Sequence, residues 1–153
     1  MTQIEPLIEE SIDVDAPPAT VWKLVTDLPR MASWSPQVVR TVVRGGPVAL
    51  GTRTLNINRR GPLVWPTRSK VVRFEPHRDF AFRIKDNNTI WSFALEPTGT
   101  GTRVVQRREA PNGTTKVSDT LIRRVMGGQE SFQGELRTGM QQTLRRLKVD
   151  AEA

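Results

Sequence analysis

The sequence predicts an α+β domain in which a curved seven-stranded antiparallel sheet wraps around a long C-terminal helix. Three observations predict this class: an alternating segment followed by two short helical segments, then six closely spaced strand-like segments, then a long helical stretch. Short links make consecutive strands antiparallel neighbours. The long helix must bury its apolar stripe against the sheet, which would curl around it and leave a cavity between the two.

The first strand and the two short helices come first in the chain. Residues 8–14 alternate as a strand, although Glu10 falls on the apolar side of the alternation. A proline pair at 17–18 ends this strand and starts a helix expected at 19–28, because proline is tolerated in the first turn of a helix. Asp27 is expected to cap a short second helix.

Six further strands are expected after the second helix. Turns rich in glycine, proline and asparagine separate them at the spacing of hairpins. The expected strands are 38–44, 51–59, 64–74, 79–85, 89–96 and 102–109.

The C-terminal helical segment contains the glycine-rich stretch MGGQESFQGELRTGM. Each of its four glycines costs a helix about 1 kcal/mol relative to alanine. Gly128 and Gly139 lie at the edge of the apolar stripe, where they would let sheet backbone or a ligand come close. Gly127 and Gly134 point to the back, which packing against the sheet does not explain; Gly127-Gly128 could instead mark a break after a short helix at 118–126. The stripe consists of Leu121, Val125, Phe132, Leu136, Met140, Leu144 and Leu147.

Composition indicates a single domain spanning residues 1–153, long enough to bury one core. The chain has no cysteine, which excludes a disulfide framework and thiol chemistry. No apolar run approaches the roughly 20 residues of a membrane span, and the N-terminus lacks the features of a signal peptide. We therefore expect a cytoplasmic protein without integral membrane association.

The net charge of +7 is unevenly distributed along the chain. Residues 1–27 hold six acids and one base, so the remainder holds 22 bases and 10 acids. A basic body could suit nucleic acid or an anionic membrane surface. Pairs such as Arg59-Arg60 and Arg107-Arg108 lie in expected strands, where neighbours point to opposite faces and cannot form one dense patch. We therefore favour a solvated basic surface over nucleic-acid binding.

Three stretches resemble the START-like (SRPBCC) superfamily, in its bacterial polyketide cyclase/dehydrase-like branch. They read IDVDAPPATVWKLVTDLPRMASWSP (12–36), WSFALEPTGTGTRVVQRRE (91–109) and ELRTGMQQTLRRLK (135–148). The resemblance spans nearly the whole chain. It implies a helix-grip fold whose C-terminal helix covers a deep pocket for lipids, polyketides or other apolar ligands. Because the family has no universal catalytic signature, the resemblance assigns no catalytic residue.

Residues of the common catalytic and metal sites are scarce. The single histidine, His77, lies in an expected tight turn, and no second histidine or cysteine could share a metal with it. Tyrosine is absent, and neither a GxSxG motif nor a phosphate-binding glycine loop occurs. We expect no metal and no cofactor.

Polar residues on inward faces are the remaining candidates for chemistry. Gln106 and Arg108 alternate with Val104, which would aim Gln106, and with it Arg108, toward the cavity. We favour an arrangement in which Gln106 bonds to the helix while Arg108 lies at the open rim, paired with Glu10 or Glu109. Glu10 is expected in an ion pair rather than as a general base. The predicted ligand-binding residues are Trp34, Leu55, Trp65, Trp91, Phe93, Gln106, Arg108, Phe132, Leu136 and Met140.

Three functions are compatible with these observations. The preferred one is binding of a small hydrophobic or amphipathic molecule, lipid-like or polyketide-like, in the central cavity. An alternative is a cyclase or dehydratase in which Glu10, Gln106 or Arg108 assists enolisation. The third is a binder of nucleic acid or an acidic partner through the basic surface. The sequence allows either a monomer or a homodimer.

Overall fold

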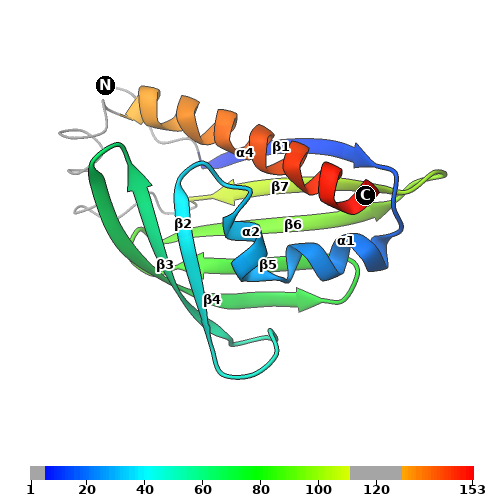
Figure 1. Cartoon of the computed structure of the whole chain (residues 1–153), viewed down its shortest axis with the longest axis horizontal. Helices are drawn as coiled ribbons and strands as arrows, with labels where there is room; N and C mark the ends of the chain where they lie inside the picture. Colours follow the sequence, from blue (N-terminus) through cyan, green and yellow to red (C-terminus); the bar gives the residue numbers. More distant parts are fainter. Residues whose placement is uncertain (1–5, 111–128) are drawn as a thin grey trace.

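The computed structural model describes residues 6–110 and 129–153, and in the last helix it describes side chains from residue 133 onward. It confirms the expected α+β class, with one seven-stranded sheet, two short helices and a long C-terminal helix (Figure 1). In chain order the elements are β1 (Leu7–Val14), α1 (Pro18–Val25), α2 (Leu28–Ala32), β2 (Val38–Arg44), β3 (Arg53–Arg60), β4 (Leu63–Glu75), β5 (Asp79–Ile84), β6 (Thr89–Pro97), β7 (Thr102–Glu109) and α4 (Gln129–Glu152).

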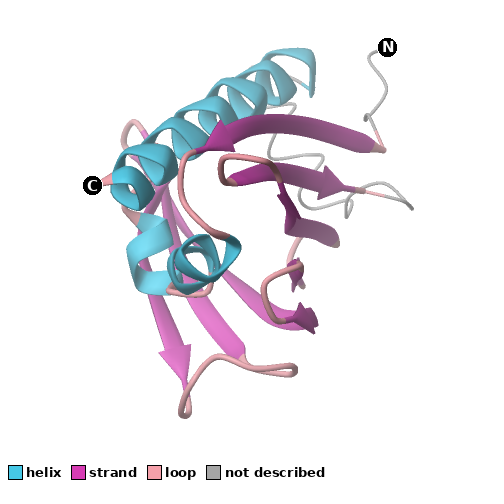
Figure 2. Ribbon diagram, turned by 90° about the vertical axis from the view of Figure 1, so that its right-hand side faces the viewer, coloured by secondary structure: helices cyan, strands magenta, loops and turns pink. Residues whose placement is uncertain are grey.

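The strands are hydrogen-bonded in the order β1-β7-β6-β5-β4-β3-β2, and each neighbouring pair is antiparallel. Strands β2 to β7 therefore form a meander, and β1 pairs with β7, which leaves β1 and β2 at the two edges. The sheet curls, with α4 lying across its open side and α1 and α2 within the curve (Figure 2). This arrangement places the inner face of the sheet opposite the helices.

The two short helices begin as the sequence predicts. Pro18 opens α1, and the side chain of Asp27 accepts a hydrogen bond from the backbone N–H of Arg30 at 3.3 Å, which confirms Asp27 as the cap of α2. Helix α1 ends at Val25 rather than at residue 28, because residues 26 and 27 form the link to α2. The predicted end of the first helix therefore lies three residues too far along the chain.

The core lies between α1, α4 and the strands at the centre of the sheet. Trp22 of α1 packs edge-on against Phe74 and Phe80, with ring centroids 5.2 and 6.2 Å apart. Leu144 and Leu147 of α4 belong to the same cluster and are almost completely buried. These contacts fill one end of the space between sheet and helix.

Trp34, directly after α2, connects that helix to the C-terminal end of α4. Its indole Nε1 donates a hydrogen bond to Oδ2 of Asp150 at 2.6 Å, and Arg30 donates to the same oxygen at 3.3 Å. Arg146 of α4 donates to the backbone oxygen of Ser33 at 3.1 Å. Helix α2 is thus held against α4 by polar contacts as well as by packing.

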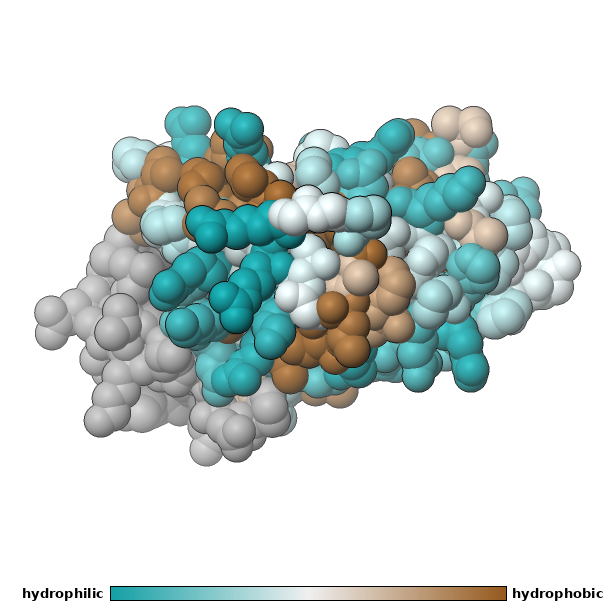
Figure 3. Space-filling view, turned by 90° about the horizontal axis from the view of Figure 1, so that it is seen from below, coloured by the Kyte–Doolittle hydropathy of each residue, from teal (hydrophilic) through white to brown (hydrophobic). Residues whose placement is uncertain are grey.

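Some large hydrophobic side chains remain on the surface. Viewed from below, hydrophobic patches lie among hydrophilic side chains (Figure 3). Within the described ranges, no helix is long and apolar enough to cross a membrane. The exposed large hydrophobic residues of these ranges include Leu7, Val39, Val42, Leu50, Val64 and Val149.

Candidate functional site

A cavity of about 820 Å³ lies between α2, α4 and the inner face of the sheet. Side chains from β2 to β7 form its walls, while residues of α4 from Gly134 to Thr143 and residues of the α2–β2 connection form its cover. Phe93 belongs both to this lining and to the core cluster around Trp22. The cavity and the packed core are therefore neighbours beneath α4, with Phe93 at their boundary.

One wall of the cavity, contributed by β2, β3 and β4, is polar. Thr41 donates from Oγ1 to Oδ1 of Asn56 at 3.0 Å, and Asn58 donates from Nδ2 to Oγ1 of Thr67 at 3.0 Å. The same Asn58 amide also donates to the backbone oxygen of Trp65 at 3.2 Å. Asn56, Asn58 and Thr67 are less than a tenth exposed, and their mutual bonds satisfy part of their hydrogen-bonding capacity.

Another part of the lining, contributed by β5, β6 and α4, is largely apolar and aromatic. Phe82 of β5 and Phe93 of β6 line it from the sheet, together with Trp91, whose indole nitrogen donates to Oγ1 of Thr89 at 3.2 Å. Leu136 and Met140 line it from α4. A ligand in this cavity would meet flat hydrophobic side chains on one side and amide and hydroxyl groups on the other.

Two polar residues of β7 lie at the base of the cavity. Arg108 is 2% exposed, and its Nη2 donates to Oε1 of Gln133 on α4 at 3.3 Å. Gln106 is 5% exposed, and its Oε1 accepts no hydrogen bond within the part of the chain that the structure describes. The cavity thus offers a cationic donor beside a buried acceptor, and buried polar atoms without a partner are unfavourable until something bonds to them.

The favoured position for Arg108 at the open rim is wrong. Arg108 is buried, and its guanidinium donates to Gln133 of α4. Arg107, its neighbour, points to the outer face and pairs with Glu9, as expected for adjacent residues on a strand.

Glu10 does form polar contacts, but with α4. Its Oε1 accepts a hydrogen bond from Nε2 of Gln141 at 3.2 Å and lies 3.9 Å from Nη1 of Arg137. This agrees with the expectation of an ion pair for Glu10. The carboxylate is not part of the cavity lining, so it is not placed to act on a ligand there.

The rim of the cavity is bridged by Arg60 of β3 and Glu135 of α4, which both line it. Nη2 of Arg60 lies 2.9 Å from Oε1 of Glu135, and Nε lies 3.0 Å from Oε2. The hydrogen bond to Glu135 raises the pKa of the Arg60 guanidinium, so this side chain stays charged. The pair connects the sheet to the helix beside the opening.

Seven of the ten predicted ligand-binding residues line the cavity: Trp65, Trp91, Phe93, Gln106, Arg108, Leu136 and Met140. Trp34 does not, because its buried indole is directed to Asp150. Leu55 does not, because it lies on the outer face of β3. The side chain of Phe132 lies outside the described residues, as do Ser118, Leu121, Val125, Gly127, Gly128 and the short helix expected at 118–126.

The polar wall was missed in the sequence, although its signal was present. Residues of β3 alternate between Thr54, Asn56 and Asn58 on one side and Leu55 and Ile57 on the other. An ordinary half-buried strand turns its apolar side inward. In β3 the small polar residues face the cavity, so the assumption that apolar residues face inward assigns the wrong side of this strand to the cavity.

Both described glycines of α4 lie at the cavity. A Cβ at Gly139 would lie 3.4 Å from Cγ of Pro36, so this glycine faces the connection after α2 rather than the backbone of the sheet. Gly134, expected on the back of the helix, lines the cavity, and a Cβ there would have no heavy atom within 4 Å. The small size of both residues therefore leaves space at the cavity without being required by close packing.

His77 lies in the exposed turn between β4 and β5, away from the cavity lining. Its φ of 66° places it in the left-handed region. Within residues 6–110 and 129–153, no group of three or more histidine, aspartate or glutamate side chains is placed to hold a metal ion.

Comparisons with known proteins agree with this geometry. A family model described as "Polyketide cyclase / dehydrase and lipid transport" matches residues 6–152. The solution structure of the Polyketide_cyc-like protein Cgl2372 from Corynebacterium glutamicum is 28% identical, with a TM-score of 0.59 over 93% of this chain and 88% of that one. No curated protein matches the sequence.

Two further solved structures share the fold at lower identity. The di-domain ARO/CYC StfQ from the steffimycin biosynthetic pathway is 18% identical, with a TM-score of 0.73 over 96% of this chain and 50% of that one. The Zhui aromatase/cyclase from Streptomyces sp. R1128 is 15% identical, with a TM-score of 0.70 over 95% of this chain and 93% of that one.

Proposed function

The chain belongs to the polyketide cyclase/dehydrase and lipid transport family, and we propose that it is a single domain spanning residues 1–153 that binds one small amphipathic molecule beneath α4. The observation that carries this proposal is the cavity of about 820 Å³ with one polar and one aromatic wall. Pockets that hold small organic ligands measure about 300–1,000 Å³ and combine apolar walls with a few polar groups.

The division of the walls favours a flat molecule with several oxygen atoms over a simple fatty acid. Phe82, Trp91 and Phe93 on β5 and β6 offer stacking surfaces, while Asn56 and Asn58 on β3 offer amide groups. An acyl chain would leave those amide groups facing hydrocarbon, which is unfavourable for polar atoms. An aromatic or polyketide-like ligand can satisfy both walls at once.

Arg108 and Gln106 are the proposed anchor for a polar end of the ligand. The guanidinium of Arg108 can donate to a carboxylate, phenolate or enolate oxygen, and Oε1 of Gln106 can accept from a ligand hydroxyl. Hydrogen bonds to charged groups contribute about 1.5–3 kcal/mol. We therefore expect Arg108 to favour anionic ligands over neutral ligands of the same shape.

Two fluorescent probes test the anchor. Wild-type protein should bind anionic 8-anilinonaphthalene-1-sulfonate and neutral N-phenyl-1-naphthylamine, each at one per chain. Arg108→Gln should weaken the anionic probe roughly 10- to 100-fold and leave the neutral probe nearly unchanged. Arg107→Gln is the matched control, because this neighbour on β7 pairs with Glu9 on the outer face. Equal losses in both variants would contradict the anchor, and a wild type that saturates with neither probe would contradict the proposal.

An enzymatic role is the second candidate, supported by the buried guanidinium of Arg108. Such a group could stabilise the negative oxygen that forms when a proton leaves the carbon between two carbonyl groups. The step also needs a base, and the carboxylate among the lining residues is Glu135, which is engaged with Arg60 at the rim. Glu10, the sequence-based candidate, is outside the lining.

Exchange of a carbon-bound proton separates the two functions. An enzyme of this type should accelerate deuterium exchange at the central carbon of an aryl 1,3-diketone, followed by NMR in heavy water. Arg108→Gln should abolish the acceleration. A protein that only binds should leave the exchange rate at its value in buffer while still binding N-phenyl-1-naphthylamine.

A further inference from the structure

On strands β2, β3 and β4, aliphatic side chains lie on the outer face of the sheet and polar side chains lie on the inner face. Val42, Leu55 and Ile57 lie on this outer face, while Thr54 and Asn56 face inward and are buried. Val42 is 39% exposed, and Val64 at the start of β4 is 57% exposed. In a sheet with one solvated face, hydrophobic residues normally point to the core. Aliphatic side chains therefore form an outer surface on these three strands.

Strand register places basic residues around this aliphatic surface. Arg44, Arg53 and Lys70 pair in one row across β2, β3 and β4, and residues directly opposite each other in a sheet point to the same side. A second row joins Val42, Leu55 and Arg68, and a third joins Arg40, Ile57 and Pro66. The basic residues of this outer face are Arg40, Arg44, Arg53, Arg59, Arg68 and Lys70.

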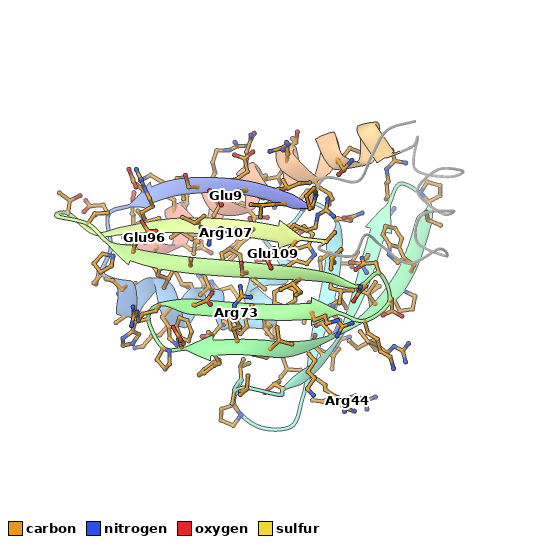
Figure 4. All side chains as sticks on the ribbon, turned by 180° about the vertical axis from the view of Figure 1, so that it is seen from behind. Glu9, Arg44, Arg73, Glu96, Arg107 and Glu109 are labelled. Atoms are coloured by element: carbon orange, nitrogen blue, oxygen red, sulfur yellow. The ribbon has the colours of Figure 1, made fainter. Side chains whose placement is uncertain are left out.

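Positive charge on this face is largely uncompensated. Residues 28–74 contain no aspartate or glutamate and nine arginines and lysines. Arg68 pairs with Asp86 at 3.3 Å, but among the described residues no carboxylate forms an ion pair with the other five. Arg44 projects outward from the end of β2 (Figure 4).

The outer face at the other edge of the sheet differs. Arg107 of β7 pairs with Glu9 of β1 at 2.7 Å (Figure 4). Arg103 pairs with Asp13 at 3.1 Å. Arginines there are neutralised by acids of the neighbouring strand. The excess charge of the protein is therefore concentrated on β2, β3 and β4. The two arginine pairs on strands, Arg59-Arg60 and Arg107-Arg108, do separate to different faces as expected.

We propose that the outer face of β2, β3 and β4 docks on the surface of an anionic phospholipid bilayer. Cationic side chains are attracted to acidic headgroups, and the aliphatic side chains between them can enter the boundary between headgroups and acyl chains. A nucleic acid would use the cations equally well, but single-stranded nucleic acid binds by stacking on aromatic side chains. Val42, Leu55, Ile57 and Val64 offer no such surface. The aliphatic centre therefore favours a membrane.

Vesicle flotation with two charge-matched variants tests the proposal. The full chain should float with vesicles of equal parts phosphatidylcholine and phosphatidylglycerol and not with phosphatidylcholine alone. The triple variant Arg44→Gln/Arg53→Gln/Lys70→Gln removes the three charges of one cross-strand row. Each basic residue contributes roughly fivefold to partitioning onto the vesicles, so the variant should partition about 100-fold more weakly. Lys23→Gln/Arg78→Gln/Arg145→Gln changes the net charge equally at exposed sites elsewhere and should retain most of the binding.

A second pair of variants tests the aliphatic contribution. Val64→Ser should lower partitioning several-fold, whereas Val149→Ser, at an exposed position on α4, should not. Unchanged melting temperatures show that the variants fold. Absence of binding to the acidic vesicles, or equal losses in the two charge variants, would overturn the proposal. The proposal would also be overturned if the protein bound single-stranded RNA more tightly than the acidic vesicles and Val64→Ser left that RNA binding unchanged. None of these outcomes depends on ligand binding in the cavity.

Discussion

Arg60 on β3 and Glu135 on α4 form a two-point ion pair across the rim of the cavity, with N–O distances of 2.9 and 3.0 Å. Both side chains are partly exposed, so the pair contributes little to the stability of the fold. Its location gives it a different role. It connects the sheet to the helix at a partly exposed part of the cavity lining, and we expect a ligand that passes there to separate the two side chains.

Removing this pair should speed ligand exchange without changing stability. In Glu135→Gln, the dissociation rate of N-phenyl-1-naphthylamine, measured by stopped-flow fluorescence, should rise several-fold because the rim opens more often. Added salt should accelerate release from the wild type and have less effect on the variant. Glu9→Gln, which breaks the Arg107 pair on the outer face, is the control and should leave release unchanged. Identical rates in all three proteins would exclude a role for the pair at the rim.

Asp150 should contribute to stability through Trp34. Asp150→Ala leaves the buried indole N–H of Trp34 without its acceptor, and an unsatisfied buried donor costs about 1–3 kcal/mol. Denaturant unfolding should show this loss in the wild-type background. In a Trp34→Phe background the same substitution should cost clearly less, because no N–H is left to satisfy. An equal loss in both backgrounds would show that Asp150 acts through other contacts.

Substitution by alanine should stabilise the protein at Gly134 and Gly139 and destabilise it at Gly101. Gly134→Ala and Gly139→Ala should each raise the free energy of unfolding by up to about 1 kcal/mol, because both glycines are helical and have space for a methyl group. Gly101→Ala should lower it by about 1–3 kcal/mol, because a Cβ there would lie 2.1 Å from the backbone oxygen of Val14. Destabilisation by alanine at Gly134 or Gly139 would mean that these residues meet something that the described contacts do not include.

The same helix explains what the sequence could and could not predict about the glycines. Gly139 was expected to let sheet backbone or a ligand come close, but its neighbour is Pro36, which is distant in sequence and which a Cβ would meet at an ordinary contact distance. A helical wheel gives the direction of a residue relative to its own helix and not the identity of what lies opposite. Gly134 was placed on the back, whereas the cavity extends far enough around α4 to reach it.

Most strands could be predicted because turns and alternation fix them locally. Strand β2 at Val38–Arg44 and strand β7 at Thr102–Glu109 have the expected bounds, and the other strands differ by one or two residues at an end. Gln106 and Arg108 were correctly placed on the inner face, because Val104 and Phe93 mark that side of the sheet. On β3 the same reasoning selected Leu55, because alternation reveals two faces but not which one is enclosed.

The position of Trp34 depended on tertiary structure. Trp34 was predicted to bind the ligand, and nearby Ser35, Pro36 and Gln37 do line the cavity. The indole itself turns away because Asp150, more than a hundred residues later, supplies an acceptor. A partner this remote in the chain leaves no local signal.

Binding of a neutral apolar probe to a variant with a filled cavity tests the central claim most directly. Leu136 is partly buried and lines the cavity from α4, so the indole in Leu136→Trp should occupy ligand space rather than displace the core. Wild type and Val149→Trp, a control on the exposed side of the same helix, should bind N-phenyl-1-naphthylamine at one per chain with equal affinity. Leu136→Trp should bind it at least tenfold more weakly at an unchanged melting temperature. Equal affinity in Leu136→Trp and wild type would contradict the account, because the probe would then be binding outside the cavity.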